Sequence, residues 1–256
     1  LQAAFMGLGG VFFLSFGGFI ADQNWRYPFA IYLFSLLLVP CALSFLVEPE
    51  RHQPINPNQE IVTETQKLPI KLVIITYGIG ILTQIVFYLI PVQLPFYLKQ
   101  LFNAGASQSG IAIALATLLS AMASLLYREI KAKLSFTAIY GIAFLNMGIG
   151  YYFISIGKPY LIILLGLGIA GSGLGLLMPN MNFCLTSVTP DAMRGKIISG
   201  VTTSLFLGQF LSPLLSQPLS VKVGLANTYA FAGGFMFVLA VMALITLYYN
   251  LHDGKI

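Results

Sequence analysis

The most suggestive candidate for chemistry in the sequence is the run 166–171 (GLGIAG), which matches the pattern G-x-G-x-x-G. In a dinucleotide-binding site this pattern lies between a strand and a helix, with an acidic residue about 20 positions further on. Asp191 follows Gly171 at that distance, but it lies in a polar turn across a long apolar span. We therefore reject a nucleotide site and interpret the glycines as small residues of a membrane helix.

Hydrolytic and metal chemistry also lack the side chains that they need. A general base, a pair of metal ligands or two carboxylates would have to meet at one place. Both histidines, His52 and His252, lie in polar segments, whereas Cys41 and Cys184 lie singly in apolar ones. The sequence therefore predicts no enzyme, no cofactor, no metal site and no disulfide framework.

The composition points to a membrane protein. Of the 256 residues, 57% are hydrophobic and only 8% are charged, whereas soluble domains carry about 25% charged residues. We predict an all-α polytopic membrane protein. The formal net charge of +5 is then explained by basic loops at the membrane surface, and we expect no binding of nucleic acid.

Eight apolar segments are long enough to be membrane helices, which need about 20 residues. They are 2–21, 27–47, 70–98, 105–127, 135–156, 159–187, 196–220 and 224–250. The stretch 48–69 holds four prolines and four of the eight acidic residues, so we expect a linker there. The chain begins without a methionine or a polar lead-in, and we expect it to be the C-terminal part of a longer protein.

The basic residues predict the orientation, because cytoplasmic loops are enriched in lysine and arginine. With alternating crossings, four basic residues fall on one side: Arg26, Lys99, Lys158 and Lys222. The other nine fall on the opposite side: Arg51, Lys67, Lys71, Arg128, Lys131, Lys133, Arg194, Lys196 and Lys255. Both termini and residues 48–69 are therefore predicted to be cytoplasmic.

Polar and small residues form stripes along several of the segments. In segment 70–98 the stripe includes Tyr77, Gly80, Gln84 and Tyr88 together with two prolines, and it fits either a packing face or the wall of a hydrated cavity. In segment 196–220 every fourth residue from Gly200 to Ser216 is small, which predicts a close helix contact. No acidic or basic residue falls securely inside a segment, so we see no ion relay in these helices.

Several of these motifs resemble those of the major facilitator superfamily. The pattern G-x-G-x-G-L-L-M-P-N at 171–180, T-P-D-A-M-R-G-K at 189–196, and Gly200, Gly208 and Pro213 resemble its tenth and eleventh helices. Gly17-Gly18, Asp22 and the turn 25–29 (WRYPF) resemble the end of its antiporter signature and the turn that follows.

The chain departs from the family patterns at two places. Phe13 and Leu14 stand where the drug–proton antiporter signature has glycine and proline. The loop 128–133 lies where the family repeats a basic motif, and it keeps the positive charge but lacks the glycines and the aspartate.

The resemblance implies twelve helices in two six-helix bundles joined by a long cytoplasmic loop. The eight segments would be helices five to twelve, with the first four missing. Residues 1–47 would be the last two helices of the N-terminal bundle, residues 48–69 the cytoplasmic linker, and residues 70–256 a complete C-terminal bundle. We expect an integral, multi-pass protein of a bacterial plasma (inner) membrane.

The resemblance also implies a function, namely secondary active transport of a small molecule by alternating access. The third and sixth segments should line the cavity, with Tyr77, Gln84, Tyr88 and Asn180 as lining residues. Motif residues would be Asp191, Arg194 and Gly195 at the cytoplasmic hinge, and Gly17 and Gly18 in the antiporter-like helix.

The wall that these residues would form is uncharged, so we expect an amphipathic or weakly polar substrate, and we favour efflux of drug-like compounds. The expected partners are this substrate and the lipid bilayer. The sequence leaves open whether a proton or another ion is coupled to transport. The alternatives are uptake of a metabolite, and a truncated membrane remnant or scaffold that does not transport.

Overall fold

The computed structural model describes residues 2–45 and 69–252. Before the predicted linker lie α1 (Gln2–Gln23), the short 3-10 helix η1 (Tyr27–Tyr32) and α2 (Leu33–Phe45). After it come α3 (Ile70–Phe87), α4 (Leu89–Phe102), α5 (Ala106–Lys133), α6 (Phe136–Ile156), α7 (Tyr160–Val188), α8 (Asp191–Val223) and α9 (Leu225–His252). Residues 48–68 of the predicted linker lie outside the described residues.

Six helical stretches within the described residues are long and apolar enough to cross a membrane. They are Ile70–Phe102, Ala106–Lys133, Phe136–Ile156, Tyr160–Val188, Asp191–Val223 and Leu225–Asn250. The prediction of an all-α polytopic membrane protein is confirmed, and these six match the last six predicted segments. The first predicted segment corresponds to α1, and η1 and the 13-residue α2 divide the second.

Two helices are longer than the sequence predicted. α5 continues through the basic run to Lys133, and α8 already begins at Asp191, so the charged hinge is shortened to Thr189 and Pro190. Cations in the last turn of α5 and the acid in the first turn of α8 complement the helix dipoles. Most residues of both extensions are good helix formers, which explains why the polar runs are helical rather than looped.

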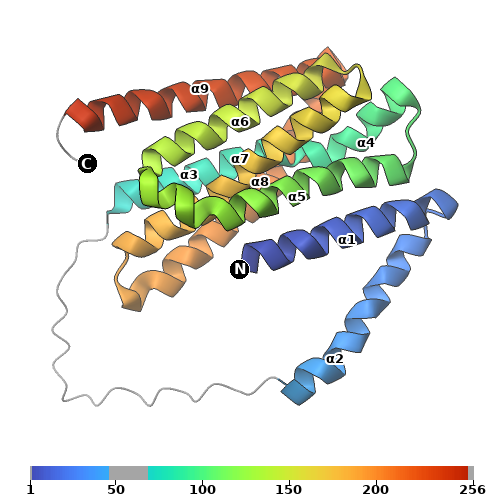
Figure 1. The fold of residues 1–256 in the computed structure, drawn as a ribbon, viewed down its shortest axis with the longest axis horizontal. Coiled ribbons are helices and arrows are strands. Elements are labelled where there is room, and N and C mark those ends of the chain that lie inside the picture. The colour runs from blue at the N-terminus through green and yellow to red at the C-terminus, as the bar shows by residue number, and fades with distance from the viewer. Residues whose placement is uncertain (1, 46–68, 253–256) are drawn as a thin grey trace.

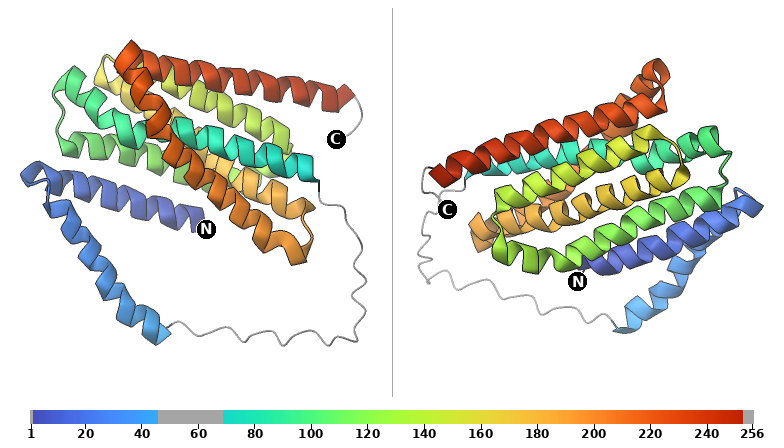
Figure 2. Two further views of the ribbon diagram at one scale, coloured as in Figure 1. Left: turned by 180° about the vertical axis from the view of Figure 1, so that it is seen from behind. Right: turned by 45° about the horizontal axis from the view of Figure 1, so that its top comes forward.

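The helices after the linker form one bundle (Figure 1). α6 packs between α7 and α9, α5 lies against α7, and α3 lies against α8. α1 runs along the outer side of α5, as both views of Figure 2 show, while α2 diverges from the bundle and contacts mainly η1.

Glycines allow the central helix α7 to approach its neighbours closely. A Cβ added at Gly171 would lie 2.8 Å from the carbonyl carbon of Ala116 in α5, and one at Gly175 would lie 2.8 Å from that of Ser120. On the other side, a Cβ at Gly166 would lie 2.6 Å from the carbonyl oxygen of Gly150 in α6. The G-x-G-x-x-G run therefore lies within a helix–helix contact, as membrane helices with small residues pack.

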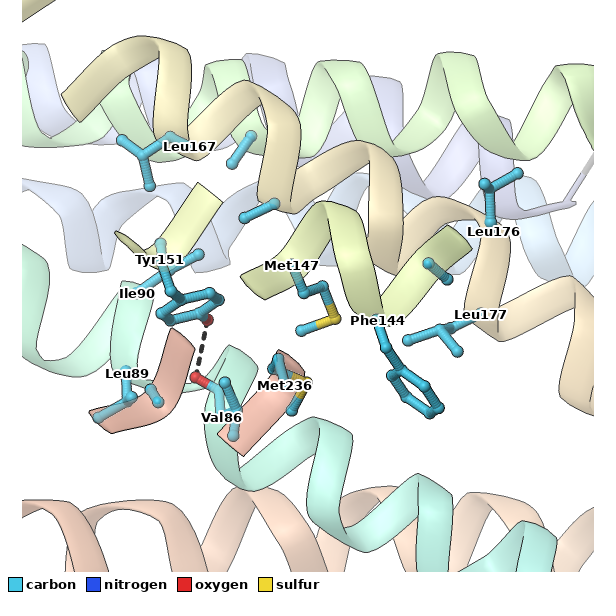
Figure 3. Packing of buried hydrophobic residues seen from close by; sticks show 14 of the residues in the cluster. Val86, Leu89, Ile90, Phe144, Met147, Tyr151, Leu167, Leu176, Leu177 and Met236 are labelled. Atoms are coloured by element: carbon cyan, nitrogen blue, oxygen red, sulfur yellow. Dashed lines mark hydrogen bonds between the residues drawn. The ribbon is translucent and has the colours of Figure 1, made fainter. Parts of the chain in front are cut away.

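The core of the bundle is built from large apolar side chains of α3, α4, α6, α7 and α9. Figure 3 shows Tyr151 and Met147 of α6 in one cluster with Ile90 of α4, Leu167 of α7 and Met236 of α9. Tyr229 of α9 is also fully buried, and its ring lies 5.5 Å from that of Tyr97 and 6.0 Å from that of Tyr151. These aromatic contacts fix α4, α6 and α9 around one point.

Candidate functional site

The predicted segment 70–98 is not one helix, because it breaks at Tyr88 between α3 and α4. Pro91 has no backbone N–H, so the carbonyl of Phe87 loses its helical donor, and the proline ring disfavours a straight helix. The backbone bonds on either side persist, with Tyr88 N donating to Gln84 O at 3.0 Å and Val92 N donating to Tyr88 O at 3.2 Å. The break lies near the middle of a candidate membrane span.

Hydroxyl groups from three other helices donate hydrogen bonds to carbonyls around this break. Ser212 of α8 donates to Ile85 O at 2.7 Å. Tyr151 of α6 donates to Val86 O at 2.7 Å (Figure 3). Tyr229 of α9 donates to Leu89 O at 3.0 Å. Irregular backbone at membrane depth is tolerated where neighbouring helices satisfy its polar groups, so these bonds fix the α3–α4 junction in its bent form.

The row of small residues on α8 lies against α3 and α4 along its whole length. A Cβ at Gly208 would lie 2.5 Å from Ile81 O, and one at Gly80 would lie 2.9 Å from Ser204 Oγ. Further along, Ser216 Oγ accepts a hydrogen bond of 2.8 Å from Gln93 Nε2. The contact that the four-residue spacing predicted is therefore present, and its partner is the broken helix.

Of the predicted cavity residues, Tyr77, Gln84 and Tyr88 lie on α3 or at its end. Tyr77 is half-buried and its hydroxyl donates to Ile197 O in α8 at 2.8 Å. Gln84 is 5% exposed, with its Cβ close to Gly208. The half-buried Tyr88 lies at the break, its ring edge-to-face with that of Phe87 at 6.1 Å. The structure thus brings two of these residues onto the α3–α8 contact.

Asn180 on α7 has different neighbours from these three. It is fully buried. Its Oδ1 accepts a hydrogen bond of 3.1 Å from the Tyr127 hydroxyl of α5, and its Nδ2 donates to Phe136 O at 3.2 Å. Asn180 therefore ties α7 to α5 and to the start of α6, and its role as a lining residue stays a prediction.

Three buried polar atoms on the broken helix have no hydrogen-bond partner among the described residues. They are Thr83 Oγ1, Gln84 Oε1 and Gln93 Oε1. Buried polar side-chain atoms are normally paired with protein or ordered water. Sequence reasoning missed Thr83 and Gln93, although both are polar residues inside an apolar run, and this was the signal that could have found them. Together with the Tyr140 hydroxyl of α6, these atoms are the buried side-chain groups of the described residues that can still accept hydrogen bonds, and three of the four lie on the α3–α4 helix.

A cavity of about 300 Å³ lies beside the break, between the α3–α4 helix, α8 and α9. Its lining is almost entirely apolar, with Ser216 and Thr228 as the polar residues: Leu82, Ile85, Val86, Leu89, Leu215, Ser216, Leu219, Thr228, Phe231, Ala232 and Phe235. Binding sites for small molecules share this combination of an apolar wall and few polar groups. The cavity fits an apolar group rather than a charged one.

The motif residues Asp191, Arg194 and Gly195 lie in the first turns of α8. The guanidinium of Arg194 is 2.7 Å from the Asp191 carboxylate and 3.5 Å from Thr186 O at the end of α7. Nothing lies within 4 Å of a Cβ added at Gly195. Because the ion pair is exposed and lies within α8, it stabilises the fold little. The hydrogen bond from Arg194 to Thr186 O is the contact that connects the ends of α7 and α8.

The second predicted glycine motif lies in the contact between α1 and α5. A Cβ added at Gly18 would lie 2.7 Å from Ala106 O, and one at Gly110 would lie 2.6 Å from Leu14 O. Near the other end of α1, a Cβ at Gly10 would lie 3.1 Å from Thr117 Cγ2. Gly17 instead faces η1, where a Cβ would lie 3.6 Å from Ile31 Cδ1. We call the α1–α5 contact the seam.

Asp22 closes one end of the seam. Its Oδ1 accepts a hydrogen bond of 2.6 Å from Ala106 N, and its Oδ2 accepts one of 3.1 Å from Ser107 N, so it caps the N-terminus of α5. The Ser107 hydroxyl and these two N–H groups lower the pKa of the Asp22 carboxyl. The sequence motif includes Asp22, but the partner of Asp22 lies more than 80 residues away along the chain. This partner could not be predicted from the motif.

The fold and these contacts define a polytopic α-helical membrane protein with a broken helix at its centre and glycine-lined helix contacts. The sequence model of the Major Facilitator Superfamily matches residues 1–128 and again residues 76–255. The chain belongs to the Major Facilitator Superfamily, a family of membrane transporters rather than enzymes.

A relative from Methanocaldococcus jannaschii is described as an uncharacterized MFS-type transporter. It is 26% identical to this chain over 147 residues. The match covers 57% of this chain and 38% of that protein.

Proposed function

We propose that the whole protein is a secondary transporter that moves a small, amphipathic or weakly polar solute by alternating access, and we favour efflux of drug-like compounds. The seam is the observation that carries the proposal. It joins α1, which precedes the predicted linker, to α5, which follows it. Small residues and one polar cap hold it together, so the two parts can separate without breaking an extensive polar interface.

The unpaired polar atoms of the α3–α4 helix support the expected kind of solute. Amide and hydroxyl oxygens can accept hydrogen bonds from a weakly polar molecule, and the cavity beside the same helix has an almost entirely apolar lining. The acidic and basic residues of the described spans all lie within two turns of a helix end. These helices therefore offer no charged partner for a multiply charged solute and no relay residue for a coupling proton.

A disulfide across the seam tests the proposal. The variant carries Gly10→Cys and Thr117→Cys, whose side chains come close enough for a disulfide, in a full-length protein without native cysteines. We expect oxidation to abolish accumulation of ethidium, a fluorescent lipophilic cation, in inverted proteoliposomes with a pH gradient, and reduction to restore it.

The matched control links two helices on the same side of the seam. Gly141→Cys on α6 faces Ala243 of α9, with 3.7 Å between the added Cβ and the alanine Cβ, so Gly141→Cys with Ala243→Cys should leave transport unchanged after oxidation. Full transport with the seam cross-linked would disprove alternating access through it. Absence of transport in every variant and in the unmodified full-length protein would favour the alternatives, uptake of a metabolite or a scaffold that does not transport.

A further inference from the structure

A basic pocket at the end of α5 has no part in the proposed transport path. It has a volume of about 480 Å³ and is lined by Tyr127, Arg128, Lys131, Ala132 and Phe183. The first four residues come from the last turns of α5, and Phe183 comes from α7. Because α5 is a candidate membrane span that ends at Lys133, the pocket lies where a spanning helix leaves the apolar layer and lipid headgroups begin.

The charges around this end of α5 are segregated by sign. At about 100° per residue, Arg128, Lys131 and Ala132 fall within about 100° of one another on the pocket face. Glu129 and Lys133 are four residues apart and lie together on the helix, about 130° from the centre of that face. The pocket therefore contains two cations and no acidic residue. Glu129, the acidic residue of this run, lies on another face of the helix beside Lys133.

The two cations differ in how they are held. Lys131 Nζ donates to Leu134 O at 3.1 Å and lies 4.1 Å from the centre of the Phe136 ring, which fixes the ammonium and leaves donors unused. Arg128 is exposed and makes no hydrogen bond or ion pair with a described residue. A planar guanidinium with free donors beside a fixed ammonium suits the oxygens of a phosphate group.

The remaining wall of the pocket is aromatic. The Phe183 side chain is 50% exposed and its ring lies 5.7 Å from that of Phe136. A free inorganic anion gains nothing from this exposed ring, whereas an acyl chain that runs down from a headgroup would cover it. The combination of two cations and an apolar wall favours a lipid over a soluble anion.

We propose that this pocket binds the phosphate headgroup of an anionic phospholipid, with an acyl chain of that lipid against Phe183. Basic pockets between membrane helices recognise anionic headgroups in this way, and each cation near the surface contributes about 1 kcal/mol. The site gives the basic run 128–133 a binding role besides its effect on orientation.

Binding of phosphatidylglycerol to the purified full chain in detergent, measured by native mass spectrometry and by titration, tests the site. We expect phosphatidylglycerol to bind at least tenfold more tightly than phosphatidylcholine. Arg128→Gln with Lys131→Gln should weaken its binding about thirtyfold, the product of two single-charge losses. Lys133→Gln with Lys222→Gln removes the same charge outside the pocket and should weaken binding less than threefold.

Two further measurements distinguish the binding of a whole lipid from the binding of a soluble anion. Phe183→Ser should weaken binding of phosphatidylglycerol but not of its fully deacylated glycerol phosphodiester, because only the lipid has an acyl chain to place against the ring. Inorganic phosphate should not compete at equal concentration. Equal losses in the two double variants, no preference for phosphatidylglycerol, or competition by phosphate alone would each overturn the proposal. Unchanged thermal unfolding in the same detergent without added lipid would show that the variants are folded.

Discussion

At the scale of single residues, several polar side chains in this protein act on backbone groups of other helices. Asp22 caps α5, Tyr77 bonds Ile197 O of α8, and Tyr151 and Tyr229 bond carbonyls of the broken helix. Where no water is present, leaving a backbone carbonyl or N–H unpaired destabilises the fold by more than one additional hydrogen bond stabilises it. The polar residues therefore determine which helices stay in contact rather than how soluble the surface is.

The Asp22 cap makes the seam sensitive to acid. The lowered pKa of Asp22 means that the carboxylate stabilises the seam above the usual aspartate range, about pH 4. That stabilisation is lost as the pH falls through the lowered value. With spin labels at Gln23→Cys and Gln108→Cys, we expect one narrow distance at pH 7 that broadens progressively as the pH is lowered below the usual aspartate range.

A neutral side chain at position 22 should mimic the acid condition. Asp22→Asn should give the broad distribution already at pH 7 and show little further change with pH. Asp191→Asn, which alters a carboxylate in the first turn of α8, serves as the matched control and should keep the wild-type response. A narrow distance in Asp22→Asn at pH 7 would show that the cap does not hold the seam.

At the scale of elements, the bent α3–α4 helix depends on hydroxyls from its neighbours. Tyr151→Phe leaves Val86 O without its donor, so we expect a loss of about 1 kcal/mol in the free energy of unfolding. Tyr229→Phe should act similarly at Leu89 O. Denaturation in detergent measures both, with Tyr152→Phe as the control, because the Tyr152 side chain is 54% exposed on the same helix. Equal stability of Tyr151→Phe and Tyr152→Phe would contradict this role.

Much of the helix arrangement could be predicted from the sequence, because apolar length and small-residue spacing are local properties. The stripe from Gly200 to Ser216 predicts a close contact, and the structure contains it. The partner could not be predicted, since Ser212 meets Ile85 across 127 positions. The break at Tyr88 was not predicted either. Two prolines in an apolar run are also compatible with a continuous helix, provided that neighbouring helices or water donate hydrogen bonds to the carbonyls that the prolines leave unpaired.

The candidate site was less predictable than the fold. Tyr77 and Gln84 follow the helical period and reach the same contact, but Asn180 pairs with Tyr127 and Phe136 instead. Periodicity gives the face of a helix, not its neighbour. The prediction of loops at the charged helix ends was wrong, because polar composition alone does not distinguish a solvated helix end from a turn.

At the scale of the whole molecule, the described spans constrain the topology. Six spans lie between residue 70 and residue 250, and an even number of crossings returns the chain to its starting side. The start of α3 and the end of α9 accordingly lie at the same end of the bundle in Figure 1. The nine-to-four bias of basic residues then favours the cytoplasm for that side.

Reporter fusions to the full-length protein in a bacterial host check this orientation. Alkaline phosphatase, which is active only outside the cytoplasm, should be inactive when fused within residues 48–69 or after Ile256. It should be active when fused between α4 and α5, at residues 103–105, where the chain lies on the opposite side.

Replacing Arg128, Lys131 and Lys133 with glutamine removes three of the nine basic residues. The bias then falls to six against four, and we expect part of the population to show phosphatase activity at the C-terminal fusion. Activity at both ends in the unmodified chain would reverse the orientation and place the basic pocket of α5 at the outer surface, while the same-side relation of the two ends, which follows from the six spans, would still hold.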